Sequence, residues 1–215
     1  METSNRESAY PVQLEVPLPE RYDRIQLVLR VLVCISIGLV HQSLGGLAAA
    51  LYLLLPVLAA ILISHRTGPG YIARDAAWIG NALEWIVGLY AYMLFVTDRF
   101  PLESDTRCAR VRIACGGTPT LFDALARLVA GLPHALLLAL LSIIAGILSL
   151  VMGALILIRG SAPATFQHFQ RDYVARLARF FAYHASLIDV YPPFVSAGEQ
   201  PGPSDYHAPL NDHTA

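Results

Sequence analysis

The residues that could carry chemistry are few and scattered. The chain has seven His and three Cys. His41 and His134 hold equivalent places in two long apolar blocks, so they are weak candidates for a metal or haem site, but neither has a second ligand at helical spacing. We interpret both as polar residues that bond between helices. Cys34, Cys108 and Cys115 form no CxxC pattern. We therefore expect no cofactor.

Three acidic residues invite a functional interpretation. Asp98 and Asp189 stand at matching exits of two apolar regions, and Glu84 lies within an apolar stretch. An acid at membrane depth is a functional hypothesis by default, although a position at the interface removes its cost. For Asp98 and Asp189 the ordinary alternative is that each closes a helix beside a Pro turn and pairs with an Arg of the neighbouring strand. No nucleophile, base or phosphate-loop pattern accompanies them, so we predict no catalytic residue and no enzyme.

The basic residues number 15, and all of them are Arg. Arg30 and Arg127 each open a charge-free apolar block. We predict that they are structural equivalents at the cytoplasmic mouths of two helical hairpins. Each would bond a nearby acid (Asp23 or Asp123), a phosphate, or the exit Asp of the opposite repeat. Simple snorkelling to the interface is the alternative.

Composition indicates a membrane protein. The chain is 55% hydrophobic and only 14% charged, against about 25% charged in soluble domains. Residues 31–63 and 128–158 contain no Asp, Glu, Lys or Arg, and one span needs about 20 residues. Turns at His41–Gly46 and Ala145-Gly146 would divide each block. We therefore expect four short spans, at about 24–42, 46–64, 120–140 and 142–158. Re-entrant hairpins that never cross are the alternative.

The order of the segments indicates an internal repeat. Each unit has an alternating strand, an apolar hairpin, an Arg-marked amphipathic helix and an acidic-aromatic-Pro exit. Unit 1 is residues 10–104, with hairpin 24–64 and amphipathic helix 71–97. Unit 2 is residues 105–196, with hairpin 120–158 and amphipathic helix 164–189. Residues 1–9 and 197–215 are expected to be disordered. The predicted fold is an all-α integral membrane protein with a small β element, in which the two strands pair.

The two amphipathic helices are expected to lie in the membrane interface. Arg171, Arg176 and Arg179 are interleaved with aromatic residues, as in helices that lie on an anionic surface. The matching stretch is more apolar, so residues 78–97 could instead form a fifth span. The apolar blocks carry no Arg at their predicted tips. The positive-inside rule then puts both termini in the cytoplasm of a multi-pass protein of the bacterial inner membrane.

Particular motifs give the repeat a family resemblance. The second unit reads RLVAGLPH from Arg127 to His134 and DVYPPF from Asp189 to Phe194. With the strand pattern YPVQLEV of the first unit, these motifs resemble a bacterial membrane-protein family known only as a domain of unknown function, number 4389. The first unit departs from the pattern, with Val40 in place of the Pro. The resemblance implies an integral membrane protein and supplies no activity, substrate or catalytic residue.

Two classes of function remain. The first is a non-catalytic accessory or scaffolding subunit that binds a membrane-protein partner or a second copy. The small-residue stripe Ala145, Ser149 and Gly153 suits close helix packing, within the chain or with a partner. The alternative is a protein that binds or transports a lipid or small hydrophobic molecule. The phospholipid bilayer is an expected partner of either, and a net charge of −1 argues against nucleic acid.

Overall fold

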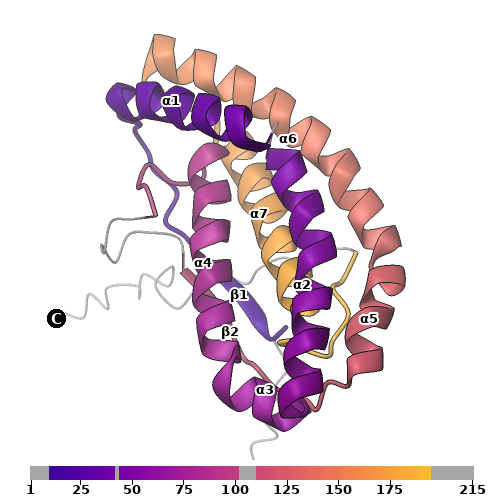
Figure 1. Cartoon of the computed structure of the whole chain (residues 1–215). Helices are drawn as coiled ribbons and strands as arrows, with labels where there is room; N and C mark the ends of the chain where they lie inside the picture. The colour runs from indigo at the N-terminus through magenta and orange to yellow at the C-terminus, as the bar shows by residue number, and fades with distance from the viewer. Residues whose placement is uncertain (1–9, 42–43, 102–109, 195–215) are drawn as a thin grey trace, which may run out of the picture.

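The computed structural model describes residues 10–41, 44–101 and 110–194 of the chain (Figure 1). The described elements are β1 (Val12–Glu15), α1 (Arg24–His41), α2 (Leu44–Arg66), α3 (Gly68–Arg74), α4 (Ala76–Met93), β2 (Arg110–Ile113), α5 (Leu121–Ala130), α6 (Leu132–Arg159) and α7 (Ala164–His184). The protein is thus mostly helical with a small β element, as predicted. The expected disordered segments 1–9 and 197–215 lie outside the described residues.

The elements form three layers. The sheet packs on α4 and α7, because β1 contacts α7 and β2 contacts α4. These two helices pack on each other and form the middle layer. On their far side α2 packs mainly on α5, while α6 packs on α7 and α1 lies across α2 and α6 (Figure 1). The helices α1, α2, α5 and α6 therefore form an outer layer.

The predicted pairing of the two strands is confirmed. β1 and β2 form an antiparallel sheet in which Val12 pairs with Ile113 and Glu15 pairs with Arg110. Alternation places Val12 and Leu14 in the core and leaves Gln13 and Glu15 exposed. An isolated two-stranded ribbon is marginal in water, so packing on α4 and α7 stabilises this one. The sheet thereby joins the two halves of the chain.

The predicted turn at Ala145-Gly146 is wrong. α6 is one helix of 28 residues that runs through this pair without interruption. A single Gly in a helix costs only about 1 kcal/mol, and the strong helix formers Ala145 and Leu148 lie close to it. The chain bends earlier, where Gly131 separates α5 from α6 just before Pro133. The spans expected at 120–140 and 142–158 are therefore replaced by a short helix followed by a long one.

The first apolar block is divided close to the predicted turn. α1 ends at His41 and α2 begins at Leu44. The two helices do not form a side-by-side hairpin, because α1 lies across the start of α2 (Figure 1). α1 also contacts α4 and α6. The side chains of Cys34 and His41, and the whole of Cys108, lie outside the described part of the chain.

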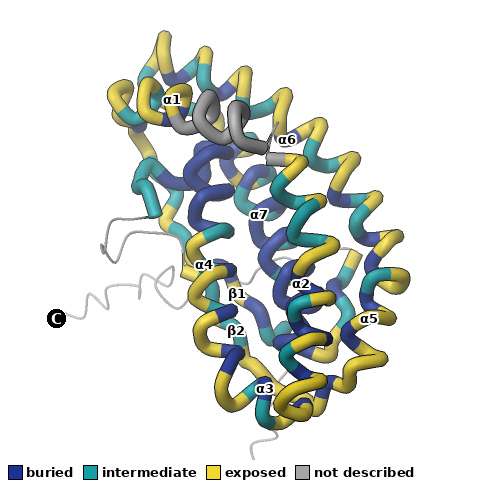
Figure 2. Tube along the Cα trace, in the orientation of Figure 1, coloured by how far each residue is buried: buried dark blue, intermediate teal, exposed yellow. Residues whose placement is uncertain are grey.

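The expectation that α7 lies with its aromatic face among lipid headgroups does not hold. Tyr173, Leu177, Phe180 and Phe181 are buried in the protein core, as is most of the second half of α4 (Figure 2). The amphipathic pattern indicated a buried face correctly, but it cannot distinguish protein from membrane as the cover. Here α4, α6 and the sheet provide that cover.

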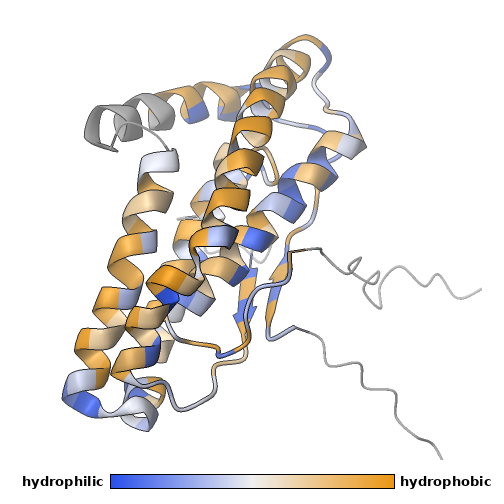
Figure 3. Ribbon diagram, turned by 90° about the vertical axis from the view of Figure 1, so that its right-hand side faces the viewer, coloured by the Kyte–Doolittle hydropathy of each residue, from blue (hydrophilic) through white to orange (hydrophobic). Residues whose placement is uncertain are grey.

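Two helices are long and apolar enough to cross a membrane, namely Gly45–Arg66 of α2 and Leu132–Arg159 of α6. Their mean hydropathies are 2.5 and 2.8, and only 28% and 17% of their most apolar windows are buried within the protein. Apolar residues run along most of the long helices, whereas polar and apolar residues alternate on the strands (Figure 3). Among the described residues α4 does not meet these criteria, so nothing supports the alternative of a fifth span there.

Candidate functional site

Arg30 on α1 is buried and bonds to the end of α4 and to the segment that follows it. Its Nε donates to the carbonyl oxygen of Tyr92 at 2.8 Å, and its Nη2 donates to the carbonyl oxygen of Thr97 at 2.7 Å. The same nitrogen pairs with Asp98 Oδ1 at 2.8 Å. The guanidinium also lies 4.3 Å from the ring centroid of Phe95, within the range of cation–π attraction. We call this arrangement the first arginine clamp.

Arg127 on α5 makes a matching set of contacts with the segment that follows α7. Its Nη1 donates to the carbonyl oxygens of Tyr183 at 2.5 Å and Ile188 at 2.6 Å. Its Nη2 pairs with Asp189 Oδ1 at 2.7 Å, and the guanidinium lies 4.5 Å from the Tyr183 ring. This is the second arginine clamp. In both clamps the accepting residues have the same spacing in the sequence.

Both clamps close on the same kind of helix end. At the end of α4, Val96 N donates to Ala91 O and Phe95 N donates to Tyr92 O. The end of α7 has the same pair of bonds, from Leu187 N to Ala182 O and from Ser186 N to Tyr183 O. These are Schellman motifs, in which the residue after the cap takes a left-handed conformation. That residue is usually Gly, but here it is Phe95 (φ 61°) and Ser186 (φ 54°).

The clamp arginines complete these helix ends. The last carbonyls of a helix lack partners within it and carry the negative end of its dipole. Arg30 and Arg127 donate to such carbonyls and bring a positive charge to them. The partner carboxylates differ in environment, because the Asp98 side chain is 16% exposed and that of Asp189 is 50% exposed. The first clamp is therefore the more deeply buried ion pair.

The acid that pairs with each arginine was not among the expected partners. Each pairs with the exit Asp of its own unit, and not with that of the opposite one. Asp123 is instead engaged in a capping box with Thr120, and those hydrogen bonds lower the pKa of Asp123. Asp23 joins the first clamp through its backbone, since its N–H donates to Asp98 Oδ2 at 2.7 Å.

His134 and His184 lie in an aromatic cluster beside the second clamp. The His134 ring stacks on Phe180 at 5.4 Å with an interplanar angle of 13°. The His184 ring lies 4.0 Å from Phe180 and its Nδ1 is 3.1 Å from the Phe180 carbonyl oxygen. Burial lowers the pKa of His184 to about 4. No group of three His, Cys, Asp or Glu side chains that could hold a metal ion occurs among the described residues.

The small-residue stripe of α6 faces its own chain. Gln170 of α7 donates from Nε2 to Ala145 O at 2.8 Å and to Ser149 Oγ at 3.0 Å. A side chain at Gly153 would meet the ring of Phe95 at 3.5 Å. The stripe therefore lets α7 and the exit segment of the first unit approach α6 closely, and it does not provide a free surface for a partner helix.

The three arginines of α7 contact protein groups. Arg176 Nη1 donates to Phe194 O at 2.5 Å. Arg179 Nε reaches the carbonyl oxygen of Val12 in β1 at 3.5 Å. Arg171 lies 3.5 Å from the neighbouring carboxylate of Asp172. Arg176 and Arg179 thus connect α7 to the exit segment and to the sheet.

Glu84 faces the sheet. Its Oε1 accepts a hydrogen bond from Val111 N in β2 at 3.3 Å. The carboxylate therefore lies beside the exposed sheet and not within a cover of apolar side chains.

Sequence reasoning missed a buried polar network around Tyr22. Gln167 Nε2 donates to Tyr22 Oη at 2.7 Å and to Pro19 O at 2.9 Å. Tyr22 Oη in turn donates to Phe95 O at 2.7 Å, and burial raises the pKa of Tyr22 to about 12. Two Gln residues one turn apart on an otherwise aromatic helix face were the available signal, because a buried amide needs partners.

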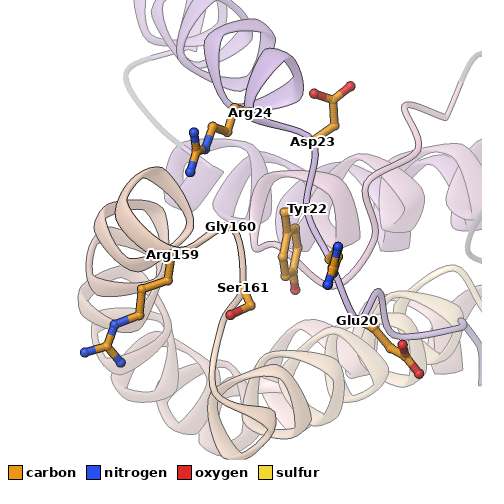
Figure 4. A pocket seen from close by; sticks show the side chains of 8 residues that line it. Glu20, Tyr22, Asp23, Arg24, Arg159, Gly160 and Ser161 are labelled. Carbon is orange, nitrogen blue, oxygen red and sulfur yellow. The ribbon is translucent and has the colours of Figure 1, made fainter.

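One pocket lies where the segment before α1 meets the end of α6. It has a volume of about 800 Å³ and is lined by Glu20, Arg21, Tyr22, Asp23, Arg24, Arg159, Gly160 and Ser161. Figure 4 shows Arg24 and Arg159 on one side of it and Glu20 on the other. Most of the lining residues are charged or polar, and the pocket lies at the edge of the outer helix layer.

The fold and the clamps define a class: a mostly helical protein with two helices able to cross a membrane and a small sheet that joins its halves. Residues 123–196 match the model of the family described as "Domain of unknown function (DUF4389)". The match covers most of α5, all of α6 and α7, and the second clamp. It confirms the family resemblance, but it does not extend to the first unit. Neither the curated proteins nor the solved structures gave a match.

Proposed function

We propose that the chain is a non-catalytic protein of the bacterial inner membrane that serves as an accessory or scaffolding subunit for membrane proteins. The observation that carries this proposal is the uncovered apolar surface of α1, α2, α5 and α6, which we call the apolar layer. Soluble monomers rarely expose contiguous apolar patches larger than a few hundred Å². Most of the exposed large apolar side chains belong to these four helices, among them Val28, Leu54, Phe122, Leu136, Ile147 and Leu150.

The use of the buried polar groups supports a non-catalytic role. The two clamp arginines pair with their aspartates and donate to carbonyl oxygens at and after the helix ends. Gln167 and Gln170 fix α7 to its neighbours. These groups stabilise the fold and leave no nucleophile beside a base in the part of the chain that the structure describes. A rigid body with an apolar layer on one side and a polar sheet on the other suits a subunit that holds other proteins at a membrane.

The proposal also includes the orientation. The first and last described segments lie together, because Tyr10 Oη donates to the carbonyl oxygen of Val190 at 3.0 Å. Both termini would then lie on one side of the membrane, and the positive-inside rule assigns that side to the cytoplasm. We further propose that the two units derive from a duplication, which the matched clamps support.

A second candidate function is binding of a lipid or small hydrophobic molecule. The pocket of about 800 Å³ favours it, because Arg21, Arg24 and Arg159 lie at the edge of the apolar layer. Arginine is well suited to bind phosphate groups, so a phospholipid headgroup would fit there.

Purification from native membranes in a mild detergent tests the proposal and separates the two candidates. The protein should stay in the membrane pellet through an alkaline carbonate wash and should then co-purify with a stoichiometric protein partner or a second copy. Tightly bound lipid without a protein partner, lost in an Arg24→Ala/Arg159→Ala variant, would support the lipid-binding alternative. Release by carbonate would reject membrane embedding altogether.

A further inference from the structure

We infer that the apolar layer lies within one leaflet of the bilayer, with its long helices along the membrane plane, so that neither α2 nor α6 crosses. This inference rests on the proposed membrane embedding and concerns its geometry. The occupant of the apolar layer is then the acyl region of a single phospholipid leaflet. Length and hydropathy alone would allow both helices to span, so the argument depends on what lies beside them.

The first step is the height of the sheet along α2. The short helix α3 joins the end of α2 to the start of α4, and the Tyr90 hydroxyl near the end of α4 faces the backbone of Ala48 near the start of α2. The two helices therefore run antiparallel, and both contact α7. Glu84 is halfway along α4 and accepts from Val111 of β2. The sheet consequently lies level with the middle of α2, as Figure 1 also shows.

The second step is the charge on that sheet. Arg112 and Glu15 form an ion pair at 3.1 Å, with side chains 70% and 48% exposed, and Arg110 is exposed beside them. If α2 crossed the bilayer, these charges would lie near its midplane, where Arg and acidic side chains are costly and normally face a protein interior or a water-filled cavity. If α2 lies along the membrane plane, the sheet faces water on the side opposite the apolar layer. The layer order of the fold, with α4 and α7 between the sheet and the apolar layer, gives this separation.

The third step concerns the two ends of α6. Arg127 lies just before α6, and Tyr22, next to the first clamp, donates its backbone N–H to Gly160 O just after α6. The two clamps are therefore at opposite ends of a 28-residue helix. A spanning α6 would put two matching clamps, and the arginines around them, on opposite sides of the membrane, which the positive-inside rule disfavours. A helix along the plane keeps both clamps on the cytoplasmic side.

The edge of the apolar layer has the chemistry of a headgroup zone. Arg24 begins α1 and Arg159 ends α6, and both are exposed beside the pocket described above (Figure 4). At the other end Arg66 closes α2. Helices that lie in an interface combine an apolar face with basic residues that contact anionic lipids. The distribution of arginine around the apolar layer matches that arrangement.

Labelling from each side of the membrane tests the inference. In a background with all three Cys replaced by Ala, single variants Thr118→Cys and Ser161→Cys place thiols at exposed positions before α5 and after α6. A membrane-impermeant maleimide is added to spheroplasts or to inverted membrane vesicles, and labelling in denaturing detergent gives the total for each variant. We expect both thiols to react in inverted vesicles and neither in spheroplasts. Reaction of the two thiols from opposite sides would show that α6 crosses and would overturn the inference.

Two further readouts separate the remaining outcomes. A carbonate wash of the same vesicles tests the proposed membrane embedding independently, because release of the protein would reject that proposal whichever side is labelled. A Leu150→Cys variant tests the occupant of the apolar layer, since Leu150 is 78% exposed on α6. Lipid cover predicts no disulfide-linked dimer under oxidation in the membrane. An efficient dimer would show that a second copy covers the apolar layer and would overturn the lipid assignment.

Discussion

Arg30 and Arg127 show how a single side chain can fix a helix end. Each donates to a carbonyl oxygen in the last turn of a helix, and each pairs with an aspartate that lies six residues after that carbonyl in the sequence. Removing one partner of a buried ion pair typically costs 3–5 kcal/mol, because the groups that remain are left unpaired. The clamps are therefore expected to matter for stability more than surface ion pairs do.

Replacing Arg127 with Leu tests the second clamp. We expect a loss of about 3 kcal/mol in unfolding free energy, because Asp189 and the carbonyls of Tyr183 and Ile188 lose their donor. Arg127→Lys should recover only part of the lost unfolding free energy, since an ammonium group cannot make the same set of hydrogen bonds as a planar guanidinium. Thermal melting in detergent measures both, with Arg110→Leu on the exposed sheet as the control. If Arg127→Leu and Arg110→Leu had the same melting temperature, Arg127 would contribute only to membrane topology and not to stability.

His184 predicts a pH dependence of stability. Its pKa is lowered from 6.5 to about 4 by burial, so the unfolded chain takes up a proton at higher pH than the folded protein. Stability is then fully present above pH 6.5 and falls as the pH approaches 4, by up to about 3 kcal/mol from this group. Melts of the wild type and His184→Gln between pH 7 and 4 measure the difference. The His184→Gln variant should lose less stability than the wild type as the pH falls. His168, which is exposed on the same helix, provides the control, and His168→Gln should lose as much as the wild type. The same loss of stability with pH in all three proteins would contradict this account.

At the residue scale, the sequence indicated which charged residues matter better than it indicated which residues they pair with. Arg30, Arg127, Asp98 and Asp189 stand out because they interrupt or border apolar blocks, and the structure joins them in two pairs. Their pairing within each unit depends on where α4 and α7 end, which is a tertiary feature. The buried Gln167 was missed because a polar residue on an amphipathic helix ordinarily faces solvent.

At the scale of elements, α6 and α7 carry the main corrections. The apolar pattern of 128–158 predicted an apolar helical region but could not tell a weak turn from a continuous helix, because Ala145-Gly146 is tolerated within either. The pattern of α7 correctly predicted an apolar face, but the prediction placed that face against lipid headgroups, whereas it packs in the protein core. An amphipathic period indicates that a face is buried, and only the packing of α4 and α6 shows against what.

Two glycines of this region give a matched test. Gly146 has open space around a potential Cβ, so Gly146→Ala should stabilise the continuous helix by about 0.5–1 kcal/mol. A Cβ at Gly131 would lie 2.4 Å from the His184 ring, so Gly131→Ala should destabilise by about 1–3 kcal/mol although its φ is −77°. The melting temperatures of the two variants, compared with that of the wild type, measure these opposite effects. Destabilisation by Gly146→Ala would restore a turn at that position.

At the scale of the whole molecule, composition correctly indicated apolar helices. The alternating stretches correctly indicated two strands, and their pairing was predicted because each is a lone strand within its unit. The arrangement in three layers could not be predicted, because it depends on α4 and α7 being enclosed between the sheet and the apolar layer. That enclosure separates a polar face from an apolar one. The separation is the basis for both the proposed membrane embedding and its orientation.

Collision quenching of spin labels in proteoliposomes tests this separation most directly. Labels replace Leu136 and Leu150, which are exposed on α6, and Arg112, which is exposed on the sheet. The account predicts that the two α6 labels are relaxed by oxygen dissolved in lipid and shielded from a water-soluble nickel chelate, and that the label at position 112 shows the reverse. Free access of the nickel chelate to positions 136 and 150 would contradict the account.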